Sequence, residues 1–180
     1  CLSTGHLVDL TSKDKEQVQT FANILQLQAK IGVKRSGSGK TTYRIQFKNV
    51  FFYEFLLSIG LTPAKSKTLG ALQIPEKYFF HFLRGVFDGD GSTYSYFDNR
   101  WKASYMFYTN FASASYDHIA WLQHQIYCKL GIKGHIVTAR DRSLMQLRYA
   151  KADSLKLLRA MYPYKNVRCL SRKRLKIQKM

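Results

Sequence analysis

Two carboxylates follow an apolar, glycine-spaced run in the stretch FLRGVFDGDGS. The spacing of the apolar residues predicts a helix, and Asp88 and Asp90 stand at its C-terminal end. Carboxylates there face the negative end of the helix dipole, which costs about 0.3–1 kcal/mol per charge unless a cation offsets it. A bound metal ion would supply that cation. The same residues also fit an ordinary amphipathic helix with a glycine-rich exit turn, so both interpretations stay open at this point.

The predicted helix also carries two glycines on one face. Gly85 and Gly89 are four residues apart, so they leave a stripe of bare backbone that another helix can approach closely. Gly91 follows the last carboxylate and can end the helix in the left-handed conformation. The segment is therefore expected to pack against a second helix near its acidic end.

The overall charge indicates the kind of partner. The 180-residue chain has 29 lysines and arginines against 11 acidic residues, a net charge of +18, and 46% hydrophobic residues to bury a core. A charge this large favours a polyanionic partner, above all nucleic acid. The basic residues are spread over the whole chain, and no apolar run approaches the roughly 20 residues of a membrane span. We therefore expect no membrane partner.

The cysteines and the N-terminal region indicate the compartment. Cys1, Cys128 and Cys169 are odd in number, widely spaced and without a C-x-x-C pair, which favours reduced thiols. Nothing in the sequence resembles a cleavable signal peptide. We expect an intracellular, non-secreted protein, in the cytoplasm of a microbe or in an organelle matrix.

Two long stretches of the chain share one order of elements. The segments LTSKDKEQVQTFANIL and FASASYDHIAWLQHQI both predict a helix, with Ser12 and Ser115 as N-caps. A basic hairpin follows each helix, with its turn at 36–39 in the first stretch and near 141–142 in the second. Each strand alternates apolar residues with long polar side chains, which predicts a sheet with one buried face and one donor-rich face.

A further helix closes each stretch. The first closing helix is expected to begin after Asn49 and to end at Gly60, and the second to end at Pro163. A basic segment follows in both cases, TPAKSK in the first stretch and LSRKR in the second. The matching order predicts a tandem repeat.

The second repeat has one element that the first lacks. A helix over 75–91, with Pro75 at its first turn, leads into the strands of the second repeat. No equivalent precedes the strands of the first. We therefore expect an incomplete first repeat over 1–73 and a second repeat over 74–180. The first repeat's copy of this helix would lie upstream of Cys1.

The segment LRGVFDGDG resembles the signature of the LAGLIDADG homing endonucleases. The match includes Leu83, Gly85, the apolar pair Val86 and Phe87, and DGDG in register. The fold of that family is an αββαββα unit, which fits the predicted order from Pro75 to the C-terminus. The resemblance implies an α+β protein of the LAGLIDADG homing-endonuclease fold, a pseudo-symmetric tandem repeat with saddle-shaped antiparallel DNA-binding sheets.

The resemblance also implies an activity and a metal. It suggests an intron-encoded, site-specific double-strand DNA endonuclease of intron homing, which hydrolyses phosphodiester bonds with Mg²⁺ or with Mn²⁺ or Ca²⁺ in its place. By position in the motif, Asp90 would bind the metal together with the carbonyl of Gly89, while Asp88 is a structural residue. The sequence offers no His/Cys cluster for zinc.

Basic residues near the metal are implied by the same resemblance. The family places one in the last segment of each repeat, and Lys65 and Lys173 stand at matching places here. They are the expected catalytic partners of Asp90, and Lys67 and Arg172 are close rivals.

The resemblance further implies how the metal site is assembled. In the family, two signature helices pack through their small residues, here Gly85 and Gly89, and bring one carboxylate from each helix together. We expect a monomer if an upstream helix exists and otherwise a homodimer. An alternative function is a non-cleaving nucleic-acid binder on the same fold, such as an intron maturase or a DNA-binding regulator.

The donor-rich faces of the two hairpins are the expected contacts with a long, specific double-stranded DNA site. Arginine pairs with guanine and glutamine with adenine through two hydrogen bonds, whereas residues near turns favour phosphates. Phosphate contact or plain exposure remains as open as base contact for each candidate. The base-contact candidates are Arg44, Gln46, Gln146 and Arg148, and the phosphate candidates are Lys34, Arg35, Lys40, Arg140 and Arg142.

Aromatic residues are frequent in the strands of the second repeat. They suggest base stacking, but strand alternation predicts that half of them face the core. The residues concerned are Tyr94, Tyr96, Trp101, Tyr105, Phe107 and Tyr108.

Overall fold

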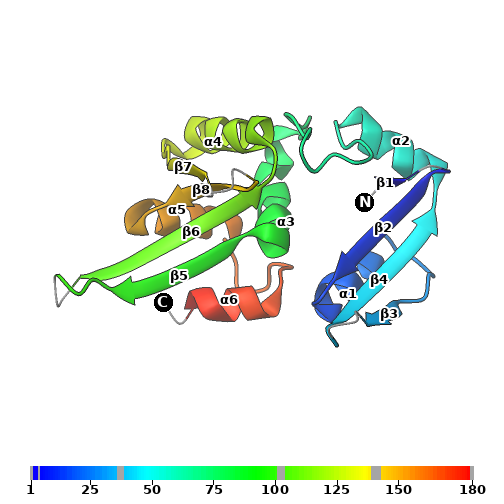
Figure 1. Cartoon of the computed structure of the whole chain (residues 1–180), viewed down its shortest axis with the longest axis horizontal. Coiled ribbons are helices and arrows are strands. Elements are labelled where there is room, and N and C mark those ends of the chain that lie inside the picture. The colour runs from blue at the N-terminus through cyan, green and yellow to red at the C-terminus, as the bar shows by residue number, and fades with distance from the viewer. Residues whose placement is uncertain (1, 4, 36–38, 101–103, 139–142, 179–180) are drawn as a thin grey trace. The chain divides into compact units, whose positions relative to one another are not determined.

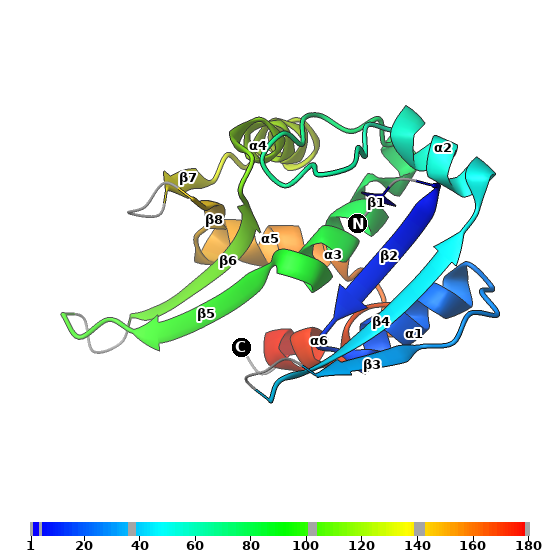
Figure 2. The same ribbon diagram turned by 45° about the vertical axis from the view of Figure 1, so that its right-hand side comes forward.

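The computed structural model divides into two compact units, Cys1–Lys65 and Ser66–Met180. The expected border of the repeats, between 73 and 74, lies inside the second unit, shortly before its first helix. Figures 1 and 2 show the elements of each unit from two directions. The structure describes residues 2–3, 5–35, 39–100, 104–138 and 143–178.

The first unit has the element order ββαββα. Its strands form one antiparallel sheet in the order β1-β2-β4-β3 (Figure 1). Helices α1 and α2 follow the two hairpins. The bounds are β1 Leu2–Ser3, β2 Leu7–Ser12, α1 Lys15–Ile24, β3 Gly32–Arg35, β4 Thr41–Lys48 and α2 Val50–Ser58.

Strand β4 gives the first sheet its two faces, as the alternation predicted. Ile45 is fully buried and packs with Val18 and Ala22 of α1, while Phe47 joins the cluster around Tyr53 of α2. Arg44 and Gln46 point to the other face because successive side chains of a strand alternate. The sheet therefore buries its apolar side under the helices and leaves a polar outer face.

The second unit has the order αββαββα, followed by one more helix. Its sheet order, β5-β6-β8-β7, repeats that of the first unit, so the α+β class and the predicted repeat of elements are confirmed (Figure 1). The bounds are η1 Glu76–Tyr78, α3 Phe79–Asp90, β5 Ser92–Phe97, β6 Tyr105–Ser113, α4 Tyr116–Leu130, β7 His135–Thr138, β8 Met145–Tyr149, α5 Lys151–Met161 and α6 Ser171–Gln178.

One hydrophobic core holds the second unit together. Helix α3 contributes Phe79, Leu83 and Phe87, all essentially inaccessible to solvent, and Phe87 meets Phe111 of β6 edge to face at 5.8 Å between ring centroids. Leu147 of β8 is buried in the same cluster. The core fixes α3 against the sheet, which determines where its acidic end lies.

The predicted helix caps are correct for α2 and wrong for α1. Asn49 caps α2, since its Oδ1 accepts a hydrogen bond from the backbone N–H of Phe52 at 2.8 Å. The N-cap of α1 is Asp14 and not Ser12. The hydroxyl of Ser12 donates to Gln17 Oε1 at 2.7 Å and accepts from the N–H of Asp14 at 3.1 Å. Ser12 therefore organises the turn before the helix.

Ser115 occupies the N-cap position of α4, but its hydroxyl does not cap the helix. It donates to the carbonyl of Leu69 at 2.5 Å, and the ring of His118 contacts the carbonyl of Gly70 at 3.0 Å. Both side chains are buried. They hold the segment before α3 against α4, an arrangement that no local sequence pattern reveals.

The two predicted hairpin turns lie largely outside the described residues, which exclude 36–38 and 139–142. The strands on either side pair as expected, from Gly32 opposite Arg44 to Arg35 opposite Thr41 in the first unit. In the second unit β7 pairs with β8 in the same antiparallel manner.

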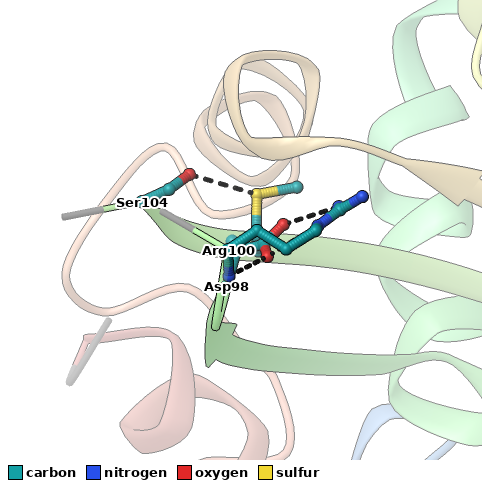
Figure 3. A network of polar contacts seen from close by, with 4 residues as sticks. Asp98, Arg100 and Ser104 are labelled. Carbon is teal, nitrogen blue, oxygen red and sulfur yellow. Dashed lines mark hydrogen bonds and ion pairs between the residues drawn. The ribbon is translucent and has the colours of Figure 1, made fainter. Parts of the chain in front are cut away.

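Strands β5 and β6 form the longest hairpin of the second unit, and an ion pair closes its described end. Asp98 accepts hydrogen bonds from the backbone N–H of Arg100 at 3.0 Å and from its guanidinium at 2.8 and 3.1 Å (Figure 3). These bonds lower the pKa of Asp98 to about 2. The backbone N–H of Asp98 donates to the carbonyl of Ser104, which joins the two strands just beyond their paired residues.

Two further expectations can be compared with the structure. No helix in the described part of the chain is both long and apolar enough to cross a membrane. Cys128 and Cys169 are free thiols, and Cys1 lies outside the described residues.

Candidate functional site

Asp90 lies exposed at the C-terminal end of α3. Gly85 and Gly89 are exposed on the same helix, and a Cβ added at Gly85 would meet no atom within 4 Å. No hydrogen bond or ion pair joins the Asp90 carboxylate to another described residue. The helix therefore presents a bare glycine face that ends in an open carboxylate.

Gly91 ends the helix differently from the prediction. It is extended, with φ −78° and ψ 162°, so the expected left-handed cap is wrong. A Cβ at this position would lie 2.7 Å from the carbonyl oxygen of Phe87. Glycine is thus required here by the close approach of the preceding turn rather than by a positive φ.

Asp88, two residues before Asp90, is buried and fully engaged. Its carboxylate accepts hydrogen bonds from the Tyr162 hydroxyl and from the backbone N–H of Leu170, both at 2.9 Å. Burial raises the pKa of Asp88, and these hydrogen bonds and the nearby Lys173 and Arg84 oppose the rise. Asp88 ties the segment between α5 and α6 to α3.

Arg84 fixes the same segment one helical turn earlier. Its buried guanidinium donates to the carbonyl oxygens of Met161 at 2.6 Å and Arg168 at 2.9 Å, and it contacts His81 Nδ1 at 2.8 Å. Arg84 and Asp88 are four residues apart on one face of α3 and carry opposite charges. Together they hold α6 in place beside the end of α3.

Lys173 of α6 supplies the cation that the acidic helix end requires. Its side chain is buried, and Nζ donates to the carbonyl oxygens of Phe87 and Gly91, the latter at 2.7 Å. The carbonyl of Phe87 also accepts the backbone N–H of Gly91 at 2.9 Å. Carbonyls at a helix C-terminus carry the negative end of the dipole, so a cation near them is favourable. The expected basic residue therefore lies next to the acidic end, with its ammonium directed at the backbone.

We expect Lys173→Met to lower the free energy of unfolding by about 1–3 kcal/mol, because it leaves two carbonyl groups without a charged donor. Urea denaturation followed by circular dichroism measures this loss. Lys156→Met, on the exposed side of α5, is the control and should change stability by less than about 0.5 kcal/mol. If the variant keeps its stability but loses DNA cleavage, Lys173 instead contacts the reacting phosphate and does not stabilise the end of α3.

Lys65 has different surroundings in the first unit. It is half-buried and lines a cavity of about 180 Å³ whose other walls are mostly apolar. Asp9 also borders this cavity. Lys65 therefore faces an opening in the core of the first unit.

Asp9 of β2 is a polar residue that the sequence analysis missed. It lies opposite Gln46 on the outer face of the first sheet and accepts hydrogen bonds from Arg44 Nε at 2.6 Å and from Gln46 Nε2 at 3.0 Å. Burial would raise the pKa of Asp9, but hydrogen bonds from Arg44 and Thr11 outweigh it and lower the pKa. Asp9 holds the two predicted base-contact residues in place. Only the pairing of β2 with β4 reveals it.

The predicted phosphate contacts of the first unit divide between two faces. Lys34 pairs with Thr42 and shares the outer face with Arg44, whereas Arg35 pairs with Thr41 on the other face. Lys40 is exposed just before β4. The other two predicted phosphate contacts, Arg140 and Arg142, lie outside the described residues.

The outer face of the second sheet combines Arg148 with amides and aromatic rings. Arg148 Nε donates to Asn110 Oδ1 at 3.2 Å, and Nη2 donates to Gln146 Oε1 at 3.3 Å. Of the aromatic residues considered above, Phe107 is buried in the core and Trp101 lies outside the described residues. The outward aromatic residues are Tyr94, Tyr96 and Tyr108.

The residues at the end of α3 fit a hard metal ion in type but not yet in number. A carboxylate and a backbone carbonyl are oxygen ligands, which Mg²⁺ prefers. Among the described residues no three His, Cys, Asp or Glu side chains gather into a metal site. A metal site at this end of α3 would have Asp90 as one carboxylate ligand, and a second carboxylate would have to come from elsewhere.

The comparisons with known proteins concern the fold. No family model and no curated protein matches the sequence. The N-terminal LAGLIDADG domain of DUF199/WhiA has a similar structure, with a TM-score of 0.57, 15% identity and coverage of 97% of this chain and 77% of its own. The homing endonuclease I-WcaI, solved bound to its DNA recognition sequence, has a TM-score of 0.63, 12% identity and coverage of 95% and 74%. The chain has the LAGLIDADG fold.

A third LAGLIDADG structure agrees with these two. Mesophilic variants of the homing endonuclease I-DmoI have a TM-score of 0.60, with 13% identity and coverage of 98% of this chain and 87% of theirs. Nearly the whole chain, both units included, thus follows the LAGLIDADG fold. Within that fold, α3 carries the residues that resemble the signature motif, and its acidic end is the position from which the function must be argued.

Proposed function

We propose that the chain binds double-stranded DNA at a long, specific site and cleaves both strands as a metal-dependent homing endonuclease. The observation that carries this proposal is the exposed carboxylate of Asp90 at the end of a helix whose glycine face is open. The fold and the net charge of +18 support DNA as the partner. I-WcaI, of the same fold, was solved bound to its DNA recognition sequence.

The outer faces of the two sheets are the proposed DNA contacts. Arg44 and Gln46 are held by Asp9 on the first sheet, and Arg148 by Asn110 and Gln146 on the second. Side chains with fixed positions lose less conformational freedom on binding, which favours their use in recognition. Lys34 shares the outer face of the first sheet and would contact phosphate.

Asp90 and the carbonyl of Gly89 are the proposed metal ligands. A bound Mg²⁺ would polarise the scissile phosphate and lower the pKa of an attacking water. Asp90 would hold the ion at the surface, while Asp88 and Lys173 keep the end of α3 rigid. Mn²⁺ or Ca²⁺ could take the same oxygen ligands.

The second carboxylate is proposed to come from another helix of the α3 type. Such a helix would pack on the exposed face of Gly85 and Gly89 and bring its own acidic end beside Asp90. It would belong either to an upstream part of the same protein or to a second copy of this chain.

A non-cleaving DNA binder is the second candidate, because Asp90 is the single carboxylate exposed at the end of α3. The DNA-contact surface is the same in both cases.

Selection of cleaved plasmids from a randomised library separates the endonuclease from the non-cleaving binder. If the chain is an endonuclease, one target sequence is enriched among the cleaved plasmids when Mg²⁺ is present, and none is enriched when a chelator is present. Binding without cleavage in either condition would establish the non-cleaving binder. If the selected target sequence occurs in an allele that lacks the intron, this would support the proposed role in intron homing.

Salt dependence tests the proposed face of the first sheet. We expect Lys34→Ala to reduce the slope of log K against log salt by about 0.9, which corresponds to one phosphate contact. Arg44→Ala should relax sequence preference at one base pair. Fluorescence anisotropy over a salt series measures the slope, and Lys15→Ala, on the exposed side of α1, is the charge-matched control. Equal slopes for both lysine variants would argue against this face.

A further inference from the structure

The outer face of the second sheet carries an ordered group of three tyrosines. Tyr94 and Tyr96 follow each other on the outer side of β5, and Tyr108 of β6 lies directly opposite Tyr94. Their rings are nearly parallel. The ring centroids are 4.9 Å apart for Tyr94 and Tyr108, 6.3 Å for Tyr96 and Tyr108, and 6.4 Å for Tyr94 and Tyr96. Their interplanar angles lie between 4° and 16°.

Arg148 completes this group, which we call the tyrosine face (Tyr94, Tyr96, Tyr108 and Arg148). Its guanidinium carbon lies 5.6 Å from the ring centroid of Tyr94 and 6.0 Å from that of Tyr108. Arginine near an aromatic ring gains a favourable electrostatic interaction. Two of its five N–H donors are used by Asn110 and Gln146, so the remaining donors have a fixed direction.

The parallel packing of the rings restricts what they can bind. Each ring face between neighbours is covered by another tyrosine, so a base cannot stack there. Strand side chains stand roughly perpendicular to the sheet, which places the phenol hydroxyls at the outer edge. A phenol hydroxyl both donates and accepts hydrogen bonds. Tyr96 is 46% exposed, so this edge is accessible.

The two sheets differ in charge. The outer face of the first sheet carries the cations Lys34, Arg44 and Lys48, with Asp9 beside Arg44, whereas Arg148 is the only lysine or arginine in the described strands of the second unit. DNA on the first sheet would therefore meet mainly charged donors, and DNA on the described strands of the second sheet would meet mainly neutral donors. Neutral contacts release no counterions, so they add affinity without increasing its dependence on salt.

We propose that the tyrosine face contacts duplex DNA through its phenol hydroxyls and its single guanidinium, and that the hydroxyls add affinity that depends little on salt. The side chains of Tyr96 and Tyr108 hydrogen-bond to each other. The phenol donors that remain contact phosphate oxygens or base-edge acceptors of one DNA segment, and Arg148 contacts a guanine. This inference rests on the proposed DNA binding and assigns the contact chemistry of one sheet.

The test uses a triple variant, Tyr94→Phe, Tyr96→Phe and Tyr108→Phe, which keeps the rings and removes the hydroxyls. The probe is a duplex that the unmodified protein has selected from a randomised library. We expect the dissociation constant to rise about 10- to 100-fold at fixed salt, with an unchanged salt slope. A triple variant at the exposed tyrosines Tyr116, Tyr127 and Tyr164, outside the strands, is the control and should bind as the unmodified protein does.

The outcomes separate this inference from the proposed function. Circular dichroism during heating establishes that both triple variants are folded. If the unmodified protein binds duplex DNA and the triple variant of Tyr94, Tyr96 and Tyr108 binds it equally well, the proposed role of the tyrosine face is wrong and the proposed DNA binding stands. A reduced salt slope in the sheet variant would also contradict it, since no charge has been removed. If the unmodified protein binds no duplex, both proposals fail.

Discussion

Replacement of Asp90 by asparagine is expected to abolish DNA cleavage while DNA binding is retained. Asparagine keeps the shape of the side chain but removes the negative charge that a divalent metal ion requires. Loss of residues that only support a metal ligand already costs about 10- to 100-fold in activity, so loss of a ligand should cost at least about 100-fold. Affinity for DNA should hold or rise slightly, because a charge that repels phosphate is gone.

The measurement is plasmid cleavage with Mg²⁺, paired with a binding assay in Ca²⁺ or chelator. Asp117→Asn, exposed in the first turn of α4, is a matched control and should leave both activities unchanged. If the Asp90→Asn variant cleaves at the rate of the unmodified protein, Asp90 is not a metal ligand. Equal loss of binding and cleavage would show that the residue serves the fold.

Arg84→Met is expected to lower the free energy of unfolding by about 3–5 kcal/mol. Removal of the buried guanidinium leaves the carbonyls of Met161 and Arg168 without their charged donor, and the carboxylate of Asp88 loses one of its two nearby cations. Small domains are stable by only about 5–15 kcal/mol, so the variant should unfold at clearly lower denaturant concentration.

Urea denaturation of Arg84→Met and of Arg84→Lys measures this effect. Lysine keeps the charge but lacks the planar fork of donors, so the lysine variant should be intermediate. Arg159→Met, exposed on α5, is the control and should change stability by less than about 0.5 kcal/mol. If Arg84→Met were as stable as the control, the network around Asp88 would not hold α6 to α3.

Periodic residues were sufficient to predict most of the fold. Apolar residues at helical spacing and alternating residues in β4 and β8 predicted the elements, because burial of one face of a helix or sheet sets that spacing directly. Asn49 was likewise identified as a cap because its partner lies three residues away. The sequence also supplied the motif from which the LAGLIDADG fold was predicted, and the structure confirms that fold.

Residues with a partner distant in sequence were not predictable in the same way. Ser115 was expected to cap a helix, yet its hydroxyl binds Leu69. Asp9 was overlooked because its partners, Arg44 and Gln46, lie beyond an intervening helix and strand. Strand register brings such groups together, and register depends on the packing of the whole sheet.

The sequence by itself determined that this protein has an acidic helix end, a basic surface and a repeated order of helices and strands, since each of these is a local property of residue type and spacing. The family resemblance already implied a structural role for Asp88 and a metal-binding role for Asp90, but only the tertiary structure shows the contacts that bury one carboxylate and leave the other open. Asp88 lies beneath the segment before α6, and Asp90 does not. Two residues of a helix separate the carboxylates by about 200° around its axis, so the packing of α6 on one side alone gives them different environments.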